Sequence, residues 1–171
     1  MKTFLFLIPF FVMHILGSTS RRPQCQSTVY LQNEFPTGWY LTVDSAKGNK
    51  LQLDKSRLYS YVDASPFISA EGIDKLEIIP EKTGDFTLKM KFTNKAAKIW
   101  ERATDVSYRE LRGLAFVVDG KLIYVGKYYK GKITDGEAPI TREEYTKHEL
   151  EEIVSKIRNG KNIKLLPTSN F

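Results

Sequence analysis

The chain has 171 residues, of which 26 are Lys or Arg and 20 are Asp or Glu, and 42% are hydrophobic. These proportions are typical of a globular domain and exclude a disordered or collagen-like chain. The single cysteine cannot form an internal disulfide, and with two histidines it cannot supply a Cys₄ or Cys₂His₂ zinc site.

The first twenty residues have the pattern of a secretory signal peptide. Lys2 precedes an apolar run from residue 4 to residue 16, and small residues follow up to Ser20. The run is short for a membrane span, which needs about 20 residues. We therefore expect cleavage after Ser20 and a secreted or periplasmic mature protein, the alternative being an uncleaved N-terminal anchor. The residues before Cys25 are not small, which argues against a lipid anchor on this cysteine.

Residues 21–66 are predicted to form a strand-rich N-terminal extension. β-Branched and aromatic residues recur in short runs separated by Gly, Pro and Asn. The expected strands cover residues 29–31, 38–43, 51–53 and 58–62.

The strand and helix signals are stronger from residue 67 onwards. A strand is expected over 76–79, and strict alternation of apolar and polar residues predicts another over 86–92. Thr93 is a candidate N-cap for a helix whose apolar residues 96, 99, 100 and 103 share one face. The apolar run 114–118 predicts a buried strand, Asp119-Gly120 a two-residue hairpin turn, and 122–125 the returning strand. One more strand is expected over 138–141.

The last predicted helix begins with a capping box formed by Thr146 and Glu149. Its buried face is expected to contain Leu150, Ile153, Val154 and Ile157, and its end is expected at Asn159-Gly160. Together these elements predict an α+β fold: a single domain with a mainly antiparallel sheet and two helices packed on one face.

Five segments occur in an order that resembles a known family: ISAEGIDKLEI, FTNKAAKIWERAT, AFVVDGKLIYV, ITDGEAPI and YTKHELEEIVSKI. The order resembles the head subdomain of the first periplasmic domain of SecD/SecDF, the accessory component of the Sec translocon. The resemblance covers residues 67–158 and implies a head-like domain over 67–166. Within it, six motif residues are interpreted as structural: Asp119, Gly120, Ile133, Gly136, Thr146 and Glu149.

The chain also departs from the family pattern. The family's proline after the hairpin is absent, with Gly126-Lys127 in that neighbourhood, and no family-type transmembrane helices follow. The resemblance therefore implies a fold and a polypeptide-contacting surface, without the proton-driven export motor. It implies no cofactor.

A basic and aromatic stretch after the hairpin is the candidate ligand-binding site. It comprises Tyr124, Lys127, Tyr128, Tyr129 and Lys130. Such a stretch can bind single-stranded nucleic acid, an extended peptide or an anionic polymer, but secretion argues against nucleic acid. The structural alternative is an edge strand that its lysines protect from aggregation. Trp39, Tyr40, Tyr59 and Tyr61 can form a second aromatic surface, and the alternative, which we favour, is that one face of them is buried in the core.

Catalytic residues are harder to identify. If the signal is cleaved, His148 is the only histidine left, and it lies in the first turn of the last helix. The acidic cluster around it includes Glu149, but acidic residues are favoured at any helix N-terminus. We therefore expect no catalytic residue and no metal site.

Three functions remain open. The first is a non-enzymatic binding module of the bacterial envelope or exterior, with an unfolded or extended polypeptide as its partner. The second is a structural envelope domain that binds a folded partner or a surface polymer, and the third, weakest, is a carboxylate-based extracellular hydrolase. A protein or peptide partner is expected in preference to nucleic acid, and the sequence gives no oligomeric state.

Overall fold

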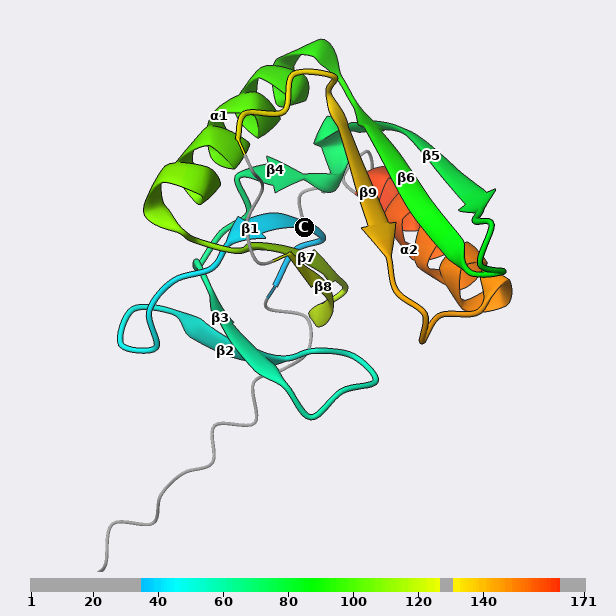
Figure 1. The fold of residues 1–171 in the computed structure, drawn as a ribbon, viewed down its shortest axis with the longest axis horizontal. Helices are drawn as coiled ribbons and strands as arrows, with labels where there is room; N and C mark the ends of the chain where they lie inside the picture. The colour runs from blue at the N-terminus through cyan, green and yellow to red at the C-terminus, as the bar shows by residue number, and fades with distance from the viewer. Residues whose placement is uncertain (1–34, 127–130, 164–171) are drawn as a thin grey trace, which may run out of the picture.

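The computed structural model describes residues 35–126 and 131–163, and it describes side chains as far as Asn159. In chain order the elements are β1 (Gly38–Leu41), β2 (Asn49–Gln52), β3 (Tyr59–Val62), β4 (Ile68–Ser69), the 3₁₀ turn η1 (Ala70–Gly72), β5 (Ile73–Pro80), β6 (Phe86–Phe92), α1 (Asn94–Glu110), β7 (Leu114–Val118), β8 (Lys121–Gly126), β9 (Glu137–Thr141) and α2 (Lys147–Ile163) (Figure 1). The predicted strand over 29–31 lies outside the described residues.

The predicted α+β class is confirmed, but the strands form three antiparallel sheets instead of one. The largest has the order β4-β1-β7-β8, β2 and β3 form a separate hairpin, and the third has the order β5-β6-β9. Alternation of apolar and polar side chains identifies strands but does not show which strands pair, so the division into three sheets could not be predicted from the sequence.

β1 lies inside the four-stranded sheet although it belongs to the N-terminal part of the chain. It pairs with β4 on one side and β7 on the other, with Trp39 opposite Phe116. The expected division of the chain at residue 66 stays a prediction, but the strand before it is hydrogen bonded to the strands after it.

The four-stranded sheet is covered on both faces. One face, including Trp39 and Phe116, packs in the main core with α1, α2 and the three-stranded sheet. The other face, including Tyr40 and Val117, packs in a smaller core against the β2–β3 hairpin. Burial on both sides explains why residues 114–118 are apolar throughout, since each side chain of β7 meets one of the two cores.

Both helices begin as expected. The side chain of Thr93 accepts a hydrogen bond from the backbone N–H of Ala96, which caps α1. At α2, Glu149 accepts hydrogen bonds from the backbone and hydroxyl of Thr146, as in a capping box. The predicted end of α2 at Asn159-Gly160 is wrong, because the helix continues to Ile163. A glycine costs a helix about 1 kcal/mol but does not by itself end it.

The remaining motif residues lie in the β7–β8 hairpin turn and in the segment before β9. Asp119 and Gly120 both have positive φ, 47° and 75°, as the two-residue hairpin turn requires. The backbone N–H of Ile133 donates to the buried hydroxyl of Thr104, which ties the segment before β9 to α1. Gly136 has φ 68°, and a Cβ there would lie 2.9 Å from the Cβ of Ala97.

We predict that Gly136→Ala lowers the free energy of unfolding by about 2 kcal/mol, because it adds both left-handed strain and a collision with α1. Gly84→Ala is the matched control, since Gly84 has φ 93° but nothing within 4 Å of the added Cβ. Urea unfolding should therefore show a smaller loss for Gly84→Ala, about 1 kcal/mol. Equal losses would contradict the role assigned to the contact with Ala97.

Candidate functional site

The structure describes only one residue of the predicted tyrosine–lysine site. Tyr124 is half-buried in β8, and its ring lies edge-on to Trp39 with 6.0 Å between the ring centroids. It therefore contributes to the main core. The other four members, Lys127, Tyr128, Tyr129 and Lys130, lie outside the described residues, and the site stays a prediction.

The four residues of the second candidate aromatic surface divide between the core and the surface. Trp39 and Tyr40 have no exposed surface, because β1 is buried on both faces of the sheet. Tyr59 and Tyr61 instead lie on the outer face of the β2–β3 hairpin, where the Nζ of Lys50 is 4.3 Å from the centroid of the Tyr59 ring. Because side chains alternate along a strand, Trp39 lies in the main core and its neighbour Tyr40 in the smaller core.

The sequence candidates for acid–base chemistry lie at the surface. The side chain of His148 is 80% accessible, and its ring nitrogens lie 3.9 Å from a carboxylate oxygen of Glu151 and 3.4 Å from one of Glu152, both in its own helix. In residues 35–126 and 131–163, no group of three or more His, Cys, Asp or Glu is placed to hold a metal ion. Within the same residues, no helix is both long and apolar enough to cross a membrane.

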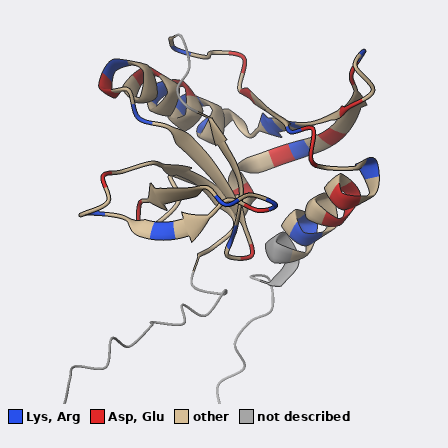
Figure 2. Cartoon of the chain, turned by 60° about the horizontal axis from the view of Figure 1, so that its bottom comes forward, with Lys and Arg blue, Asp and Glu red and all other residues tan. Residues whose placement is uncertain are grey.

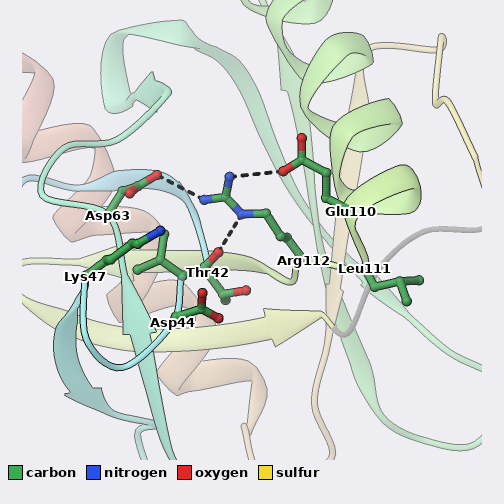
Figure 3. Close-up of a pocket in the computed structure, with 8 residues that line it drawn as sticks. Thr42, Asp44, Lys47, Asp63, Glu110, Leu111 and Arg112 are labelled. Atoms are coloured by element: carbon green, nitrogen blue, oxygen red, sulfur yellow. Dashed lines mark hydrogen bonds and ion pairs between the residues drawn. The ribbon is translucent and has the colours of Figure 1, made fainter.

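A hollow of about 590 Å³ at the end of α1 is the main candidate site (Figure 3). It lies where the turn from α1 to β7 meets the loop after β1 and the residue after β3. Its lining residues are mostly polar or charged: Thr42, Val43, Asp44, Lys47, Asp63, Glu110, Leu111 and Arg112.

Hydrogen bonds fix the wall of this hollow. The Nε of Arg112 donates to the carbonyl of Thr42 at 2.9 Å, and the hydroxyl of Thr42 accepts from the backbone N–H of Gly113 at 2.7 Å. The hydroxyl of Ser107 donates to the carbonyl of Arg112 at 2.5 Å. A Cβ on Gly113 would lie 2.8 Å from the carbonyl oxygen of Gly126, so only glycine fits at this position.

The outer nitrogens of Arg112 are held more loosely than its Nε. One lies 3.5 Å from a carboxylate oxygen of Asp63 and the other 3.4 Å from a carboxylate oxygen of Glu110 (Figure 3). These distances are at the limit of a hydrogen bond. The guanidinium can therefore exchange either carboxylate for a carbonyl or carboxylate of a bound molecule without losing its anchor on Thr42.

Leu111 presents an apolar side chain beside this polar wall. It is the C-cap residue of α1, with φ 54°, and 70% of its surface is exposed. Its side chain points away from the guanidinium of Arg112 (Figure 3). Tyr108, one turn earlier in α1, is also 47% exposed. A left-handed conformation is costly for leucine, and glycine is the usual residue at this position of a helix end.

Sequence reasoning missed Leu111 and Arg112. The available signal was the order Leu-Arg-Gly after an amphipathic helix, in which Gly113 looks like the residue that ends the helix. The structure places the left-handed residue two positions earlier, at Leu111, and uses Gly113 for its close approach to the next strand.

A second polar cluster joins the β2–β3 loop to the start of α2. The Nζ of Lys55 donates to the Oε1 of Glu149 and, at 2.7 Å, to the carbonyl of Glu144. Hydrogen bonds from Lys55 and then from Thr146 lower the pKa of Glu149 to about 2. Lys55 has φ 55° and lies in the turn between β2 and β3.

Arg142 extends this cluster inward, with only 8% of its side chain accessible. Its Nη1 donates to the carbonyls of Asp54 and Ile123 at 3.0 and 2.9 Å. The hydroxyl of Tyr145 donates to the carboxylate of Asp54, and burial together with this hydrogen bond raises the pKa of Tyr145. Since each member already holds another part of the chain, we interpret this cluster as structural.

Two solved structures of SecDF share the fold of this chain. A crystal structure of SecDF in a super-membrane-facing form has a TM-score of 0.58 and 17% identity, and the match covers 75% of this chain and 19% of that one. A structure of SecDF as a membrane component that enhances protein export has a TM-score of 0.57 and 17% identity, covering 74% and 64%. The chain thus spans less than two thirds of either protein.

These matches confirm the resemblance to SecDF at the level of the fold. They cover a larger share of the chain than residues 67–158 alone. No protein-family model matches the sequence, and no curated protein matches it at a significant level.

We predict that the contribution of Glu149 to stability is lost in acid. Its folded-state pKa of about 2 lies below the ordinary glutamate value of about 4.3. The carboxylate therefore stabilises the fold fully above pH 4.3, and this contribution disappears as the pH falls towards 2. Urea unfolding should show Glu149→Gln less stable than the wild type at pH 7 and nearly equal to it at pH 2.

Glu143→Gln is the control for this comparison, since Glu143 is an exposed glutamate just before α2 with no ion pair to the described residues. It should change stability little at either pH. A constant difference between wild type and Glu149→Gln from pH 7 to pH 2 would contradict the role of the charged carboxylate.

We also predict that Leu111→Gly raises the free energy of unfolding by about 1 kcal/mol, because glycine adopts a positive φ without strain. Leu58→Gly is the matched control: Leu58 is 68% exposed but is not among the residues with positive φ. That variant should lose about 0.5 kcal/mol or more through backbone entropy. A loss of stability in Leu111→Gly would show that the leucine side chain stabilises the fold.

Proposed function

We propose that this protein is a non-enzymatic module, secreted or periplasmic, that binds unfolded or extended polypeptide at the hollow beside Leu111 and Arg112. The observation that carries the proposal is the exposed leucine held in a left-handed conformation beside a polar wall. Strained residues persist where the surrounding structure fixes them, and they are frequent at binding sites. The fold shared with SecDF, one structure of which is described as enhancing protein export, supports a polypeptide as the partner.

The hollow offers each kind of contact that an extended polypeptide needs. Leu111 provides apolar surface for its side chains, and Arg112 can donate to its carbonyl groups. The carboxylates of Asp44 and Asp63 can accept from its N–H groups. The mixture of acidic and basic side chains favours no single charge, as a module that accepts varied sequences requires.

Burying one exposed leucine contributes about 2 kcal/mol, which corresponds to roughly thirtyfold in the dissociation constant. We therefore predict that Leu111→Asn weakens binding of an unfolded polypeptide at least tenfold, because asparagine keeps the left-handed backbone but removes the apolar contact. The measurement is a fluorescence-anisotropy titration of the purified protein into a labelled, reduced and alkylated polypeptide that stays unfolded. Leu58→Asn, at an exposed leucine that does not line the hollow, should bind like the wild type.

The same titration at low and moderate salt tests the class of partner. Apolar contacts survive salt, whereas exposed charge pairs are screened. Saturable binding that persists at moderate salt and is absent with the folded form of the same polypeptide supports the proposal. Binding that salt abolishes, or that is equal for the folded form, would instead indicate a structural domain with a folded partner or surface polymer.

A further inference from the structure

β5 is an open edge of the three-stranded sheet. It pairs only with β6, on one side. Between Asp74 and Ile79, no backbone hydrogen bond from any other described segment reaches its outer side. At eight residues, β5 is also the longest of the described strands. An edge of this kind presents a row of N–H and C=O groups to which another extended chain can pair.

The ends of β5 are protected, but its middle is not. The register with β6 shifts between Ile73 and Lys75, and Pro80 ends the strand. Bulges and prolines are common ways of blocking pairing at an edge. They leave a run of about five residues, from Lys75 to Ile79, open to a partner strand.

A groove of about 380 Å³ runs between this open strand and α2. Leu76 and Ile78 of β5 and Val154 of α2 supply its apolar surface. Leu76 and Ile78 face the same side of the sheet as Met90 and Leu88, their partners in β6. A strand added to β5 would place every second side chain in this groove.

The length of the groove matches the open run of β5. Its residues on α2 extend from Lys147 to Asn159, twelve positions that span roughly 18 Å at about 1.5 Å per residue. Five residues of strand at about 3.3 Å each span a similar length, roughly 17 Å. The helix therefore covers one side of an added strand over the whole unprotected part of β5.

The charge at the groove favours an acidic partner. Acidic and basic residues are interspersed along α2 (Figure 2). Lys147 and Glu151, both at the groove, form an i,i+4 pair at 3.7 Å. Arg158 makes no ion pair with any described residue, so it leaves one uncompensated positive charge beside the groove.

We propose that β5 and α2 form a docking groove for an extended peptide that adds as a strand to β5, with alternate apolar side chains in the groove and an acidic residue near Arg158. The groove shares no residue with the hollow beside Leu111, so the two surfaces can be tested separately.

The first test uses a fluorescein-labelled octapeptide of alternating valine and threonine with a glutamate at each end. Two versions carry N-methyl groups on alternate residues, one on the valines and the other on the threonines. In a strand, alternate N–H groups point to the same edge, so one version loses the donors that face β5 and the other keeps them. We expect the two versions to differ at least tenfold in affinity, and equal affinities would overturn strand addition.

The second test compares two charge reversals on α2. Arg158→Glu should weaken binding of the octapeptide about fivefold, and a version of the peptide with lysine in place of glutamate should recover the loss. Lys156→Glu is the matched control, because Lys156 is an exposed cation of the same helix that does not line the groove. Equal effects of the two substitutions would contradict the placement of the peptide.

A second copy of this chain is the alternative occupant of the groove. Analytical ultracentrifugation of the protein alone tests this alternative by measuring whether the protein is a monomer or a dimer. A monomer that binds the octapeptide supports the proposal. A dimer that the octapeptide does not dissociate would show that β5 pairs with its own copy and would overturn it. Failure of Leu111→Asn to affect unfolded polypeptide has no bearing on these outcomes, since that residue lies outside the groove.

Discussion

Aromatic packing around Trp39 connects the parts of this molecule. The ring of Trp39 lies 4.8 Å from that of Trp100 in α1 and 5.0 Å from that of Phe116 in β7. Trp100 in turn lies 5.1 Å from Phe92, at the end of β6. One strand from the N-terminal part of the chain is thereby fixed to α1, to the four-stranded sheet and to the three-stranded sheet. Large aromatic residues contribute much of the apolar burial in a domain of this size.

This packing also positions both proposed binding surfaces. Because Trp39 and Trp100 hold α1 against β1, the C-terminal end of α1 reaches the loop after β1. There Thr42 is hydrogen bonded to Arg112 and Gly113. Leu88 and Met90 of β6 are buried in the main core, and β5 is hydrogen bonded to this strand. The apolar side of α2 packs into the same core. Each surface is therefore carried by rigid elements and needs little reorganisation to bind a partner.

Local features of the fold were predictable from the sequence, and pairings were not. Thr93, Asp119-Gly120 and the Thr146–Glu149 box each act through residues within a few positions in the chain, so their residue types are sufficient to identify them. The position of β1 between β4 and β7 depends on contacts across more than seventy residues, as between Trp39 and Phe116. Residues 21–66 were predicted to form an extension because no local pattern in the sequence indicates these contacts.

The candidate site escaped prediction for a related reason. Sequence patterns identify residues that suit their local structure. Leu111 does not suit its left-handed conformation, so no pattern pointed to it. Three residues other than glycine have positive φ among the described residues: Lys55, Leu111 and Asp119. Asp119 lies in the two-residue hairpin turn, and the side chain of Lys55 is bound to Glu149. Leu111 alone of the three is a helix C-cap with a largely exposed apolar side chain, and its backbone N–H donates to the carbonyl of Ser107. Its residue type therefore does not match the preference for glycine at this position, which is why sequence patterns did not single it out.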